Sequence, residues 1–179
     1  MRKLGFGIIG LLVLAALAGC GDEPPPTQTQ ADEVARLQAH VVPVVDELKV
    51  LFYLDEGSSC NAILYSSGEF RDGDDSCGSP TERYGQFDSR VRGDFDRIDA
   101  AIGTSKVPTH RFDATFTTGG ALREVTFPRE DSSWQWNWSY LYDPGDTVAK
   151  DLQPGDPKVG VPKYRRINED WWLVTAVDD

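Results

Sequence analysis

The stretch HRFDATFTTGGALREVTF, residues 110–127, decides the kind of fold we expect, because its pattern is that of a β-hairpin. Apolar and polar residues alternate on both sides of Gly119 and Gly120, as they do in strands with one buried face. A glycine pair is typical of the two-residue turns that connect such strands. We therefore expect antiparallel strands over residues 109–117 and 121–127.

The register of this hairpin follows from its turn. If Thr118 pairs with Ala121, apolar side chains mostly face apolar ones, and one side of both strands can be buried together. The predicted pairs are Phe116 with Arg123, Ala114 with Val125, and Phe112 with Phe127.

Aromatic residues dominate the strands that we expect after the hairpin, over residues 133–142 and 171–177. The first of these strands carries a row of rings on one side: Trp134, Trp136, Trp138, Tyr140 and Tyr142. Such a row either packs against helices, since the other side of the strand is polar, or stacks on a sugar or a peptide. The candidate ligand contacts are Trp134, Tyr142, Trp171 and Trp172.

Two helices are expected ahead of these strands. Apolar residues at spacings of three and four predict a helix over residues 32–54. Pro43 predicts a kink near Val42, because proline removes one backbone hydrogen bond. The sequence SPTE at residues 79–82 has the form of a capping box, so we expect a second helix over residues 80–102.

Together these elements predict an α+β fold. We expect two N-terminal helices packed on an antiparallel sheet of four to five strands, in a single domain over residues 32–179. This order of elements is similar to that of cystatin-like and NTF2-like folds, whose helices lie across a curved sheet.

The start of the chain has the layout of a secretory signal peptide. A positively charged beginning precedes an uncharged apolar run over residues 4–18, which is short for a membrane span. The sequence LAGC at residues 17–20 then resembles the lipobox of bacterial lipoproteins. The resemblance implies that residues 1–19 are removed and that the Cys20 sulfur carries a diacylglyceryl group, with fatty chains such as palmitate.

This resemblance also sets the expected location. It implies a bacterial cell-envelope protein that is anchored by lipid and faces outside the cytoplasm. Residues 20–31 contain three consecutive prolines and no large apolar residue, so we expect the lipidated cysteine to be followed by a disordered tether. Cys60 and Cys77 would then lie in an oxidising compartment, where an even pair of cysteines predicts a disulfide bond.

The balance of charges limits the partners. Removing residues 1–19 takes away two cations and changes the formal net charge from −11 to −13. Such an acidic chain repels nucleic acid and anionic lipid heads, so we expect no nucleic-acid partner. The charge favours either a basic partner or general solubility, and the sequence leaves both open.

The sequence contains no recognisable catalytic motif, and we expect no catalytic residue, cofactor or metal. His40 and His110 are the two histidines, and neither lies in a zinc-binding motif. The leading hypothesis is a non-enzymatic module that binds another envelope protein and contacts the membrane through its lipid. The alternatives are a module that binds a glycan or small ligand through exposed aromatic rings, and a hydrolase.

Overall fold

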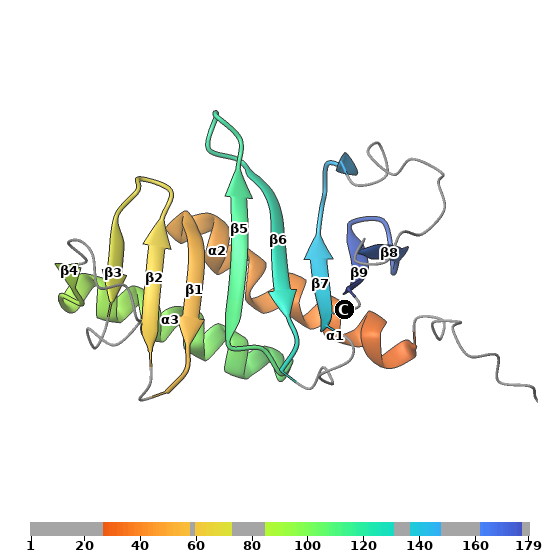
Figure 1. Ribbon diagram of the computed structural model, residues 1–179, viewed down its shortest axis with the longest axis horizontal. Coiled ribbons are helices and arrows are strands. Elements are labelled where there is room, and N and C mark those ends of the chain that lie inside the picture. The colour runs from red at the N-terminus through yellow and green to blue at the C-terminus, as the bar shows by residue number, and fades with distance from the viewer. Residues whose placement is uncertain (1–26, 58–59, 73–84, 131–136, 148–161, 177–179) are drawn as a thin grey trace, which may run out of the picture.

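The fold is a large sheet with its helices on one face (Figure 1). The computed structural model of the protein describes residues 27–57, 60–72, 85–130, 137–147 and 162–176. The helices are α1 (Gln28–His40), α2 (Val42–Leu48) and α3 (Ser89–Ser105). The strands are β1 (Val50–Asp55), β2 (Asn61–Tyr65), β3 (Phe70–Asp72), β4 (Gly85–Gln86), β5 (Arg111–Phe116), β6 (Leu122–Pro128), β7 (Asn137–Tyr142), β8 (Lys163–Arg166) and β9 (Trp171–Ala176).

Within the described residues the sheet has nine strands, in the order β4-β3-β2-β1-β5-β6-β7-β9-β8. Neighbouring strands run antiparallel except β3 and β4, which are parallel. The helices pack against one another and lie behind the sheet in Figure 1. The hydrophobic core fills the space between the two layers.

The central hairpin confirms most of the predicted register. β5 and β6 pair antiparallel, with Ala114 opposite Val125. Nearer the turn the register shifts, so that Phe116 pairs with Leu122 and not with Arg123 as predicted. The shift is confined to the residues that adjoin the turn.

The turn explains the shift. The Thr117 amide donates a hydrogen bond to the Ala121 carbonyl, so the loop between them is one residue longer than a two-residue turn. Gly120 takes a positive φ of 79°, a conformation that suits glycine because it has no side chain. A longer loop that ends in such a residue places a bulge in the adjoining strand.

The first predicted helix is interrupted where the sequence indicates, near Val42. α2 starts as a separate helix with Pro43 in its first turn, where the missing N–H group costs no helical hydrogen bond. The beginning of α1 is earlier than predicted. Thr27 and Gln30 form a capping box, so the helix extends into residues 28–31, which we expected to belong to the tether.

The predicted end of this helix at residue 54 is wrong. α2 stops at Leu48, Lys49 adopts a left-handed φ of 55°, and the following residues form β1. β1 hydrogen-bonds to β2 on one side and to β5 on the other. These long-range bonds override the helical spacing of Leu51 and Phe52, and aromatic residues pack well on a sheet.

The second predicted helix is present, but it starts and ends later than predicted. The Asp88 carboxylate caps α3 by accepting a hydrogen bond from the Val91 amide at 2.8 Å. The predicted cap at residues 79–82 lies outside the described residues, and Gly85–Gln86 form β4, so α3 cannot include them. The helix ends at Ser105, and its C-cap residue Lys106 has a φ of 56°. The predicted apolar face is confirmed, with Val91, Phe95, Ile98 and Ile102 buried.

The α+β class is confirmed, but the predicted arrangement is wrong in two respects. α3 follows β4, so the helices do not all precede the sheet. The nine strands found in the described residues exceed the four to five expected. The additional strands come from short segments whose local pattern indicated helix or irregular structure, because pairing between distant segments leaves no periodic signal. The similarity to cystatin-like and NTF2-like folds rested on element order, and we do not retain it.

A row of aromatic rings lines the core side of the sheet. The ring centroids of Tyr53 and Phe112 lie 5.5 Å apart. Phe127 lies 5.9 Å from Phe112 and 6.0 Å from Trp171. Since each such pair contributes about 0.5–1.5 kcal/mol beyond its buried area, the row holds these rings in fixed positions.

A buried ionic network joins α1 to the sheet. The Tyr140 hydroxyl donates to the Glu33 carboxylate, and Arg129 Nη1 donates to the same carboxylate at 2.7 Å. Arg129 also donates to the Tyr140 hydroxyl oxygen at 2.7 Å. Burial, together with the hydrogen bond to Glu33, raises the pKa of Tyr140, so its phenol stays neutral. The three groups therefore satisfy one another in a buried position.

Candidate functional site

The aromatic residues predicted as ligand contacts lie in different environments. Trp171 is fully buried, and Trp172 is buried with the Arg166 guanidinium 4.3 Å from its ring centroid. Trp134 lies outside the described residues. Tyr142 is half-buried and lines an open groove, so it is the predicted contact that belongs to the candidate site described below.

The described part of the aromatic row packs into the core. Tyr140 is fully buried, and Trp138 and Tyr142 pack against the core while keeping part of their surface exposed. Trp136, like Trp134, lies outside the described residues. The core interpretation is therefore supported for the rings that the structure describes.

One of the predicted covalent sites falls within the described residues. Cys60 is buried and is a disulfide cysteine. Cys20 and Cys77 lie outside the described residues. Lipidation of Cys20 and the pairing of Cys60 with Cys77 therefore stay predictions.

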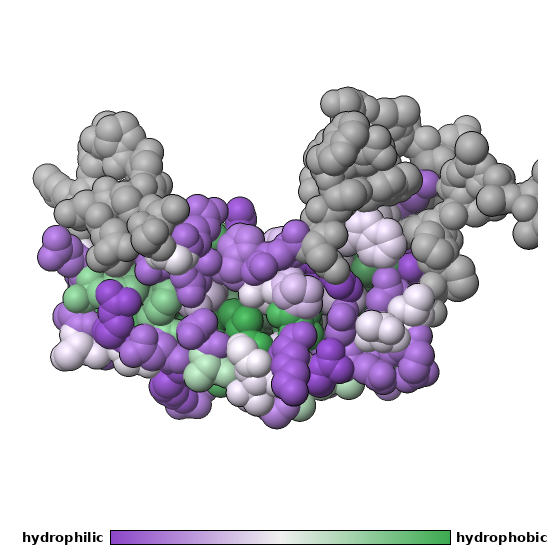
Figure 2. Space-filling model, turned by 90° about the horizontal axis from the view of Figure 1, so that it is seen from below, coloured by the Kyte–Doolittle hydropathy of each residue, from purple (hydrophilic) through white to green (hydrophobic). Residues whose placement is uncertain are grey.

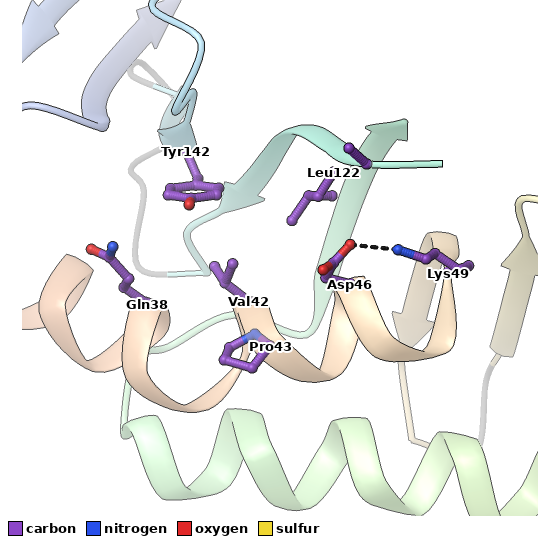
Figure 3. A pocket seen from close by; sticks show the side chains of 8 residues that line it. Gln38, Val42, Pro43, Asp46, Lys49, Leu122 and Tyr142 are labelled. Atoms are coloured by element: carbon purple, nitrogen blue, oxygen red, sulfur yellow. Dashed lines mark hydrogen bonds and ion pairs between the residues drawn. The ribbon is translucent and has the colours of Figure 1, made fainter. Parts of the chain in front are cut away.

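Tyr142 lines an open groove between α1, α2 and the neighbouring ends of β6 and β7 (Figure 3). The groove has a volume of about 450 Å³. We refer to it as the Tyr142 groove, and its described lining residues are Gln38, Val42, Pro43, Asp46, Lys49, Ala121, Leu122 and Tyr142.

The Tyr142 groove has an apolar centre and a charged end. In Figure 3 the side chains of Val42, Leu122 and Tyr142 approach the same space from three different elements. At one end Lys49 Nζ and the Asp46 carboxylate form an ion pair at 2.7 Å, with both side chains partly exposed. The groove can therefore hold an apolar group beside polar ones.

The ring of Tyr142 packs against a buried aromatic ring. Its centroid lies 5.2 Å from that of Trp171, which is fully buried. Burial raises the pKa of Tyr142, and the carboxylates of Asp170 and Asp46 raise it further, so the phenol is neutral at ordinary pH. Tyr142 thus presents a fixed aromatic face and a hydroxyl that can donate a hydrogen bond.

A second cavity opens at the end of the sheet where β1 and β6 end and β5 begins. This end is the lower one in Figure 1, and it faces the reader in Figure 2, where hydrophilic residues dominate. The cavity has a volume of about 300 Å³. Its described lining residues are Tyr53, Asp55, Gly57, Asp99, Ile102, Thr109, His110 and Glu130. We refer to it as the acidic pocket, because this lining contains three carboxylates and no lysine or arginine.

The carboxylates of the acidic pocket are held in different ways. Asp55 accepts a hydrogen bond from the Gly57 amide at 2.9 Å, and Glu130 contacts His110 Nδ1 at 2.9 Å. Asp99 lies on the exposed side of α3 and forms no ion pair with any residue that the structure describes. Even a protonated His110 would supply one positive charge against three negative ones.

Tyr53 lies at the buried side of the acidic pocket. Its side chain is 1% exposed, with its ring centroid 4.8 Å from that of Phe95 in α3. The hydroxyl oxygen is buried and has no hydrogen-bond partner among the described residues. Burial raises the pKa of Tyr53, and the carboxylates of Asp55, Asp99 and Asp96 raise it further. The phenol is therefore neutral, and it lies in a negative electrostatic environment.

Sequence reasoning did not predict the acidic pocket. Its charged members belong to segments far apart in the chain, and they come together only because β1, α3 and the β5–β6 pair meet at one end of the sheet. His110, which lies in no zinc-binding motif, also lines the pocket. The one sequence signal was the excess of acidic residues, which left a basic partner and general solubility both open and located no site.

Comparisons with known proteins give no match to this chain. No protein-family model matches it, and neither a curated protein nor a solved structure does. In the part of the chain that the structure describes, no helix is long and apolar enough to cross a membrane. Among the same residues, no three His, Cys, Asp or Glu side chains lie close enough together to hold a metal ion.

Proposed function

We propose that this protein is a lipid-anchored protein of the bacterial cell envelope, which binds another envelope protein and is not an enzyme. The observation that supports the binding role most strongly is the Tyr142 groove, with its fixed aromatic ring, apolar centre and charged end. Stable protein interfaces share this anatomy, since their energy is concentrated in buried aromatic and apolar groups within a polar rim.

The proposed anchor rests on the lipobox-like sequence at residues 17–20. A diacylglyceryl group with a further acyl chain holds a protein firmly, since each buried CH₂ contributes about 0.8 kcal/mol. Because Thr27 caps α1, residues 21–26 are all that separates the lipidated cysteine from the folded part. At up to ~3.6 Å per residue, the distance from Cys20 to Thr27 is at most about 25 Å, so we expect the partner to lie near the membrane surface.

The proposed partner presents an apolar side chain to the Tyr142 groove. That side chain would pack between Val42, Leu122 and the ring of Tyr142. A polar group beside it could accept a hydrogen bond from the neutral Tyr142 hydroxyl or contact the Asp46–Lys49 pair. This combination favours a polypeptide segment, which offers apolar and polar groups in close succession.

Photocrosslinking in living cells tests the binding role. A benzophenone amino acid would replace Ala121, which is exposed and lines the Tyr142 groove. We expect one discrete adduct of higher mass, formed by the full-length protein in its own membrane. Leu122→Asp in the same chain should abolish the adduct, because a carboxylate cannot be buried in an apolar interface without a partner.

Thr115 offers a matched control for this experiment. It is exposed, and it lies on the side of β5 opposite the buried Ala114. The same photoreactive residue at this position should give no discrete adduct. The absence of an adduct at Ala121, or the same adducts from both positions, would contradict the proposal.

Tyr142 also favours a second candidate function, which is the binding of a glycan or another small ligand. A groove of about 450 Å³ lies within the range of ligand pockets, and a partly exposed ring can stack on a sugar. Cell-wall fragments at millimolar concentration should then raise the Tm of the full chain, and Tyr142→Leu should remove the increase. An unchanged Tm with every fragment would contradict this second function.

A further inference from the structure

We propose that the acidic pocket binds the ammonium group of a primary amine. This inference concerns a site at the other end of the sheet and does not depend on the role of the Tyr142 groove. The chemistry it specifies is an organic cation, carried either by a free amine or by the side chain of a lysine.

The charges of the pocket support a cationic ligand. Asp55, Asp99 and Glu130 line it, and no lysine or arginine does so among the described residues. The neighbouring α3 cation Arg97 pairs elsewhere, with Glu47 at 2.8 Å. Glu130 contacts His110 Nδ1 at 2.9 Å, whereas Asp55 and Asp99 form no ion pair with a described residue. Negative charges that gather around a cavity attract cations into it.

The buried hydroxyl of Tyr53 is the second, independent observation. This side chain is 1% exposed and lines the pocket, and its oxygen lacks a partner among the described residues. Buried polar groups are nearly always hydrogen-bonded, so an exception requires an explanation. An ammonium group supplies three N–H donors, which can be shared between the Tyr53 oxygen and the carboxylates.

The arrangement suits an organic cation better than a metal ion. A divalent cation requires several carboxylate or imidazole ligands at short range, and no such group exists in the described residues. The carboxylates are instead spread around a cavity of about 300 Å³. That space accommodates an ammonium group together with several methylene groups, for which Ile102 provides an apolar wall.

The electrostatics of Tyr53 agree with this assignment. Burial is the largest cause of its raised pKa, and Asp55 and Asp99 are the next two. Tyr53, Asp55 and Asp99 also line the same cavity. A cation held between them would therefore lie close to the Tyr53 oxygen.

Isothermal titration calorimetry on the full-length protein in detergent tests the proposal. The probes are cadaverine, Nα-acetyl-lysine methylamide, and 1-pentanol as a neutral analogue of similar size. We expect at least one of the two amines to bind, more weakly at high salt because the attraction is electrostatic, and the alcohol not to bind. Binding of both amines indicates that the ammonium group alone is recognised, whereas binding of one identifies the source as free amine or lysine side chain.

Two variants and one matched control locate the binding. Asp99→Asn removes an exposed carboxylate that lines the pocket, and we expect it to weaken binding about fivefold. Tyr53→Phe removes the hydroxyl and should weaken binding by a similar factor. Glu169→Gln removes one negative charge from an exposed position that does not line the pocket, and it should change the affinity less than twofold.

Three results would overturn the proposal. They are the absence of binding by either amine at 10 mM, binding of 1-pentanol as tight as that of cadaverine, and an equal loss of affinity in Asp99→Asn and Glu169→Gln. Circular dichroism of each variant confirms that it is folded. Because Ala121 lies in the other cavity, crosslinking there can succeed or fail independently of amine binding.

Discussion

Replacing Tyr53 with phenylalanine should stabilise the protein, although most substitutions in a core destabilise. The change removes only the phenolic oxygen, which is buried without a hydrogen-bond partner among the described residues. A buried, unsatisfied polar group costs about 1–3 kcal/mol. Each dispersion contact of the oxygen stabilises the folded state by only about 0.1–0.2 kcal/mol. We therefore expect the free energy of unfolding to rise by about 1 kcal/mol.

Thermal unfolding followed by circular dichroism, in buffer free of amines, measures this effect. A gain of about 1 kcal/mol raises the Tm of a domain of this size by roughly 2–4 °C. Tyr140→Phe is the matched control, because the same atom is removed from a buried tyrosine that bonds to Glu33 and Arg129. It should lower the free energy of unfolding by about 2 kcal/mol.

The two substitutions should therefore change the free energy of unfolding in opposite directions. If Tyr53→Phe lowers the Tm as much as Tyr140→Phe does, the Tyr53 hydroxyl has a hydrogen-bond partner in solution. That result would refute the reasoning about its stability, and it would also remove one of the two observations behind the acidic pocket.

Further predictions concern the ionic network and the ends of α3. Glu33→Gln removes the negative charge from the buried partner of Arg129, so it should lower the free energy of unfolding by about 2–3 kcal/mol. Urea unfolding measures this loss, and a value below about 1 kcal/mol would contradict the prediction. Lys106→Gly should raise the Tm, because the left-handed φ of 56° costs about 1 kcal/mol in any residue that has a side chain. An unchanged or lower Tm would show that this backbone strain is absent. The hydrogen bond from the Val91 amide lowers the pKa of Asp88 below its ordinary value of 3.8. The ionised carboxylate therefore stabilises the folded protein fully above pH 3.8, and this stabilisation is lost as the pH falls through the lowered pKa. The Tm of the wild type should then fall more steeply than that of Asp88→Asn below about pH 4, and parallel curves would disprove this linkage.

The features that could be predicted from the sequence have local causes. The break near Pro43 follows from its missing N–H group, and the buried face of α3 follows from regular apolar spacing. The pairing of Ala114 with Val125 follows from alternation on both sides of a short turn. The one additional loop residue changed only the register beside the turn, because the rest of the pairing is set by the buried faces.

The features that could not be predicted arise between distant segments. The apolar spacing of β1 is compatible with a helix, and its strand conformation depends on hydrogen bonds to β2 and β5. The acidic pocket brings together Asp55 of β1, Asp99 of α3 and Glu130 from the segment after β6, and none of these residues has a local signature. Tyr142 was predicted as a ligand contact because it lies at the end of a strand. The residues of α2 that line the other side of its groove were not predicted as contacts.

The central claim is that a lipid on Cys20 fastens this domain to the bacterial envelope. Mass spectrometry of the protein extracted from bacterial membranes tests it most directly, alongside fractionation of a Cys20→Ser variant. We predict that the mature chain begins at Cys20 with a diacylglyceryl thioether, and that the serine variant leaves the membrane fraction. A chain that sediments with lipid while Cys20 is unmodified, or while residues 1–19 are retained, would contradict the claim.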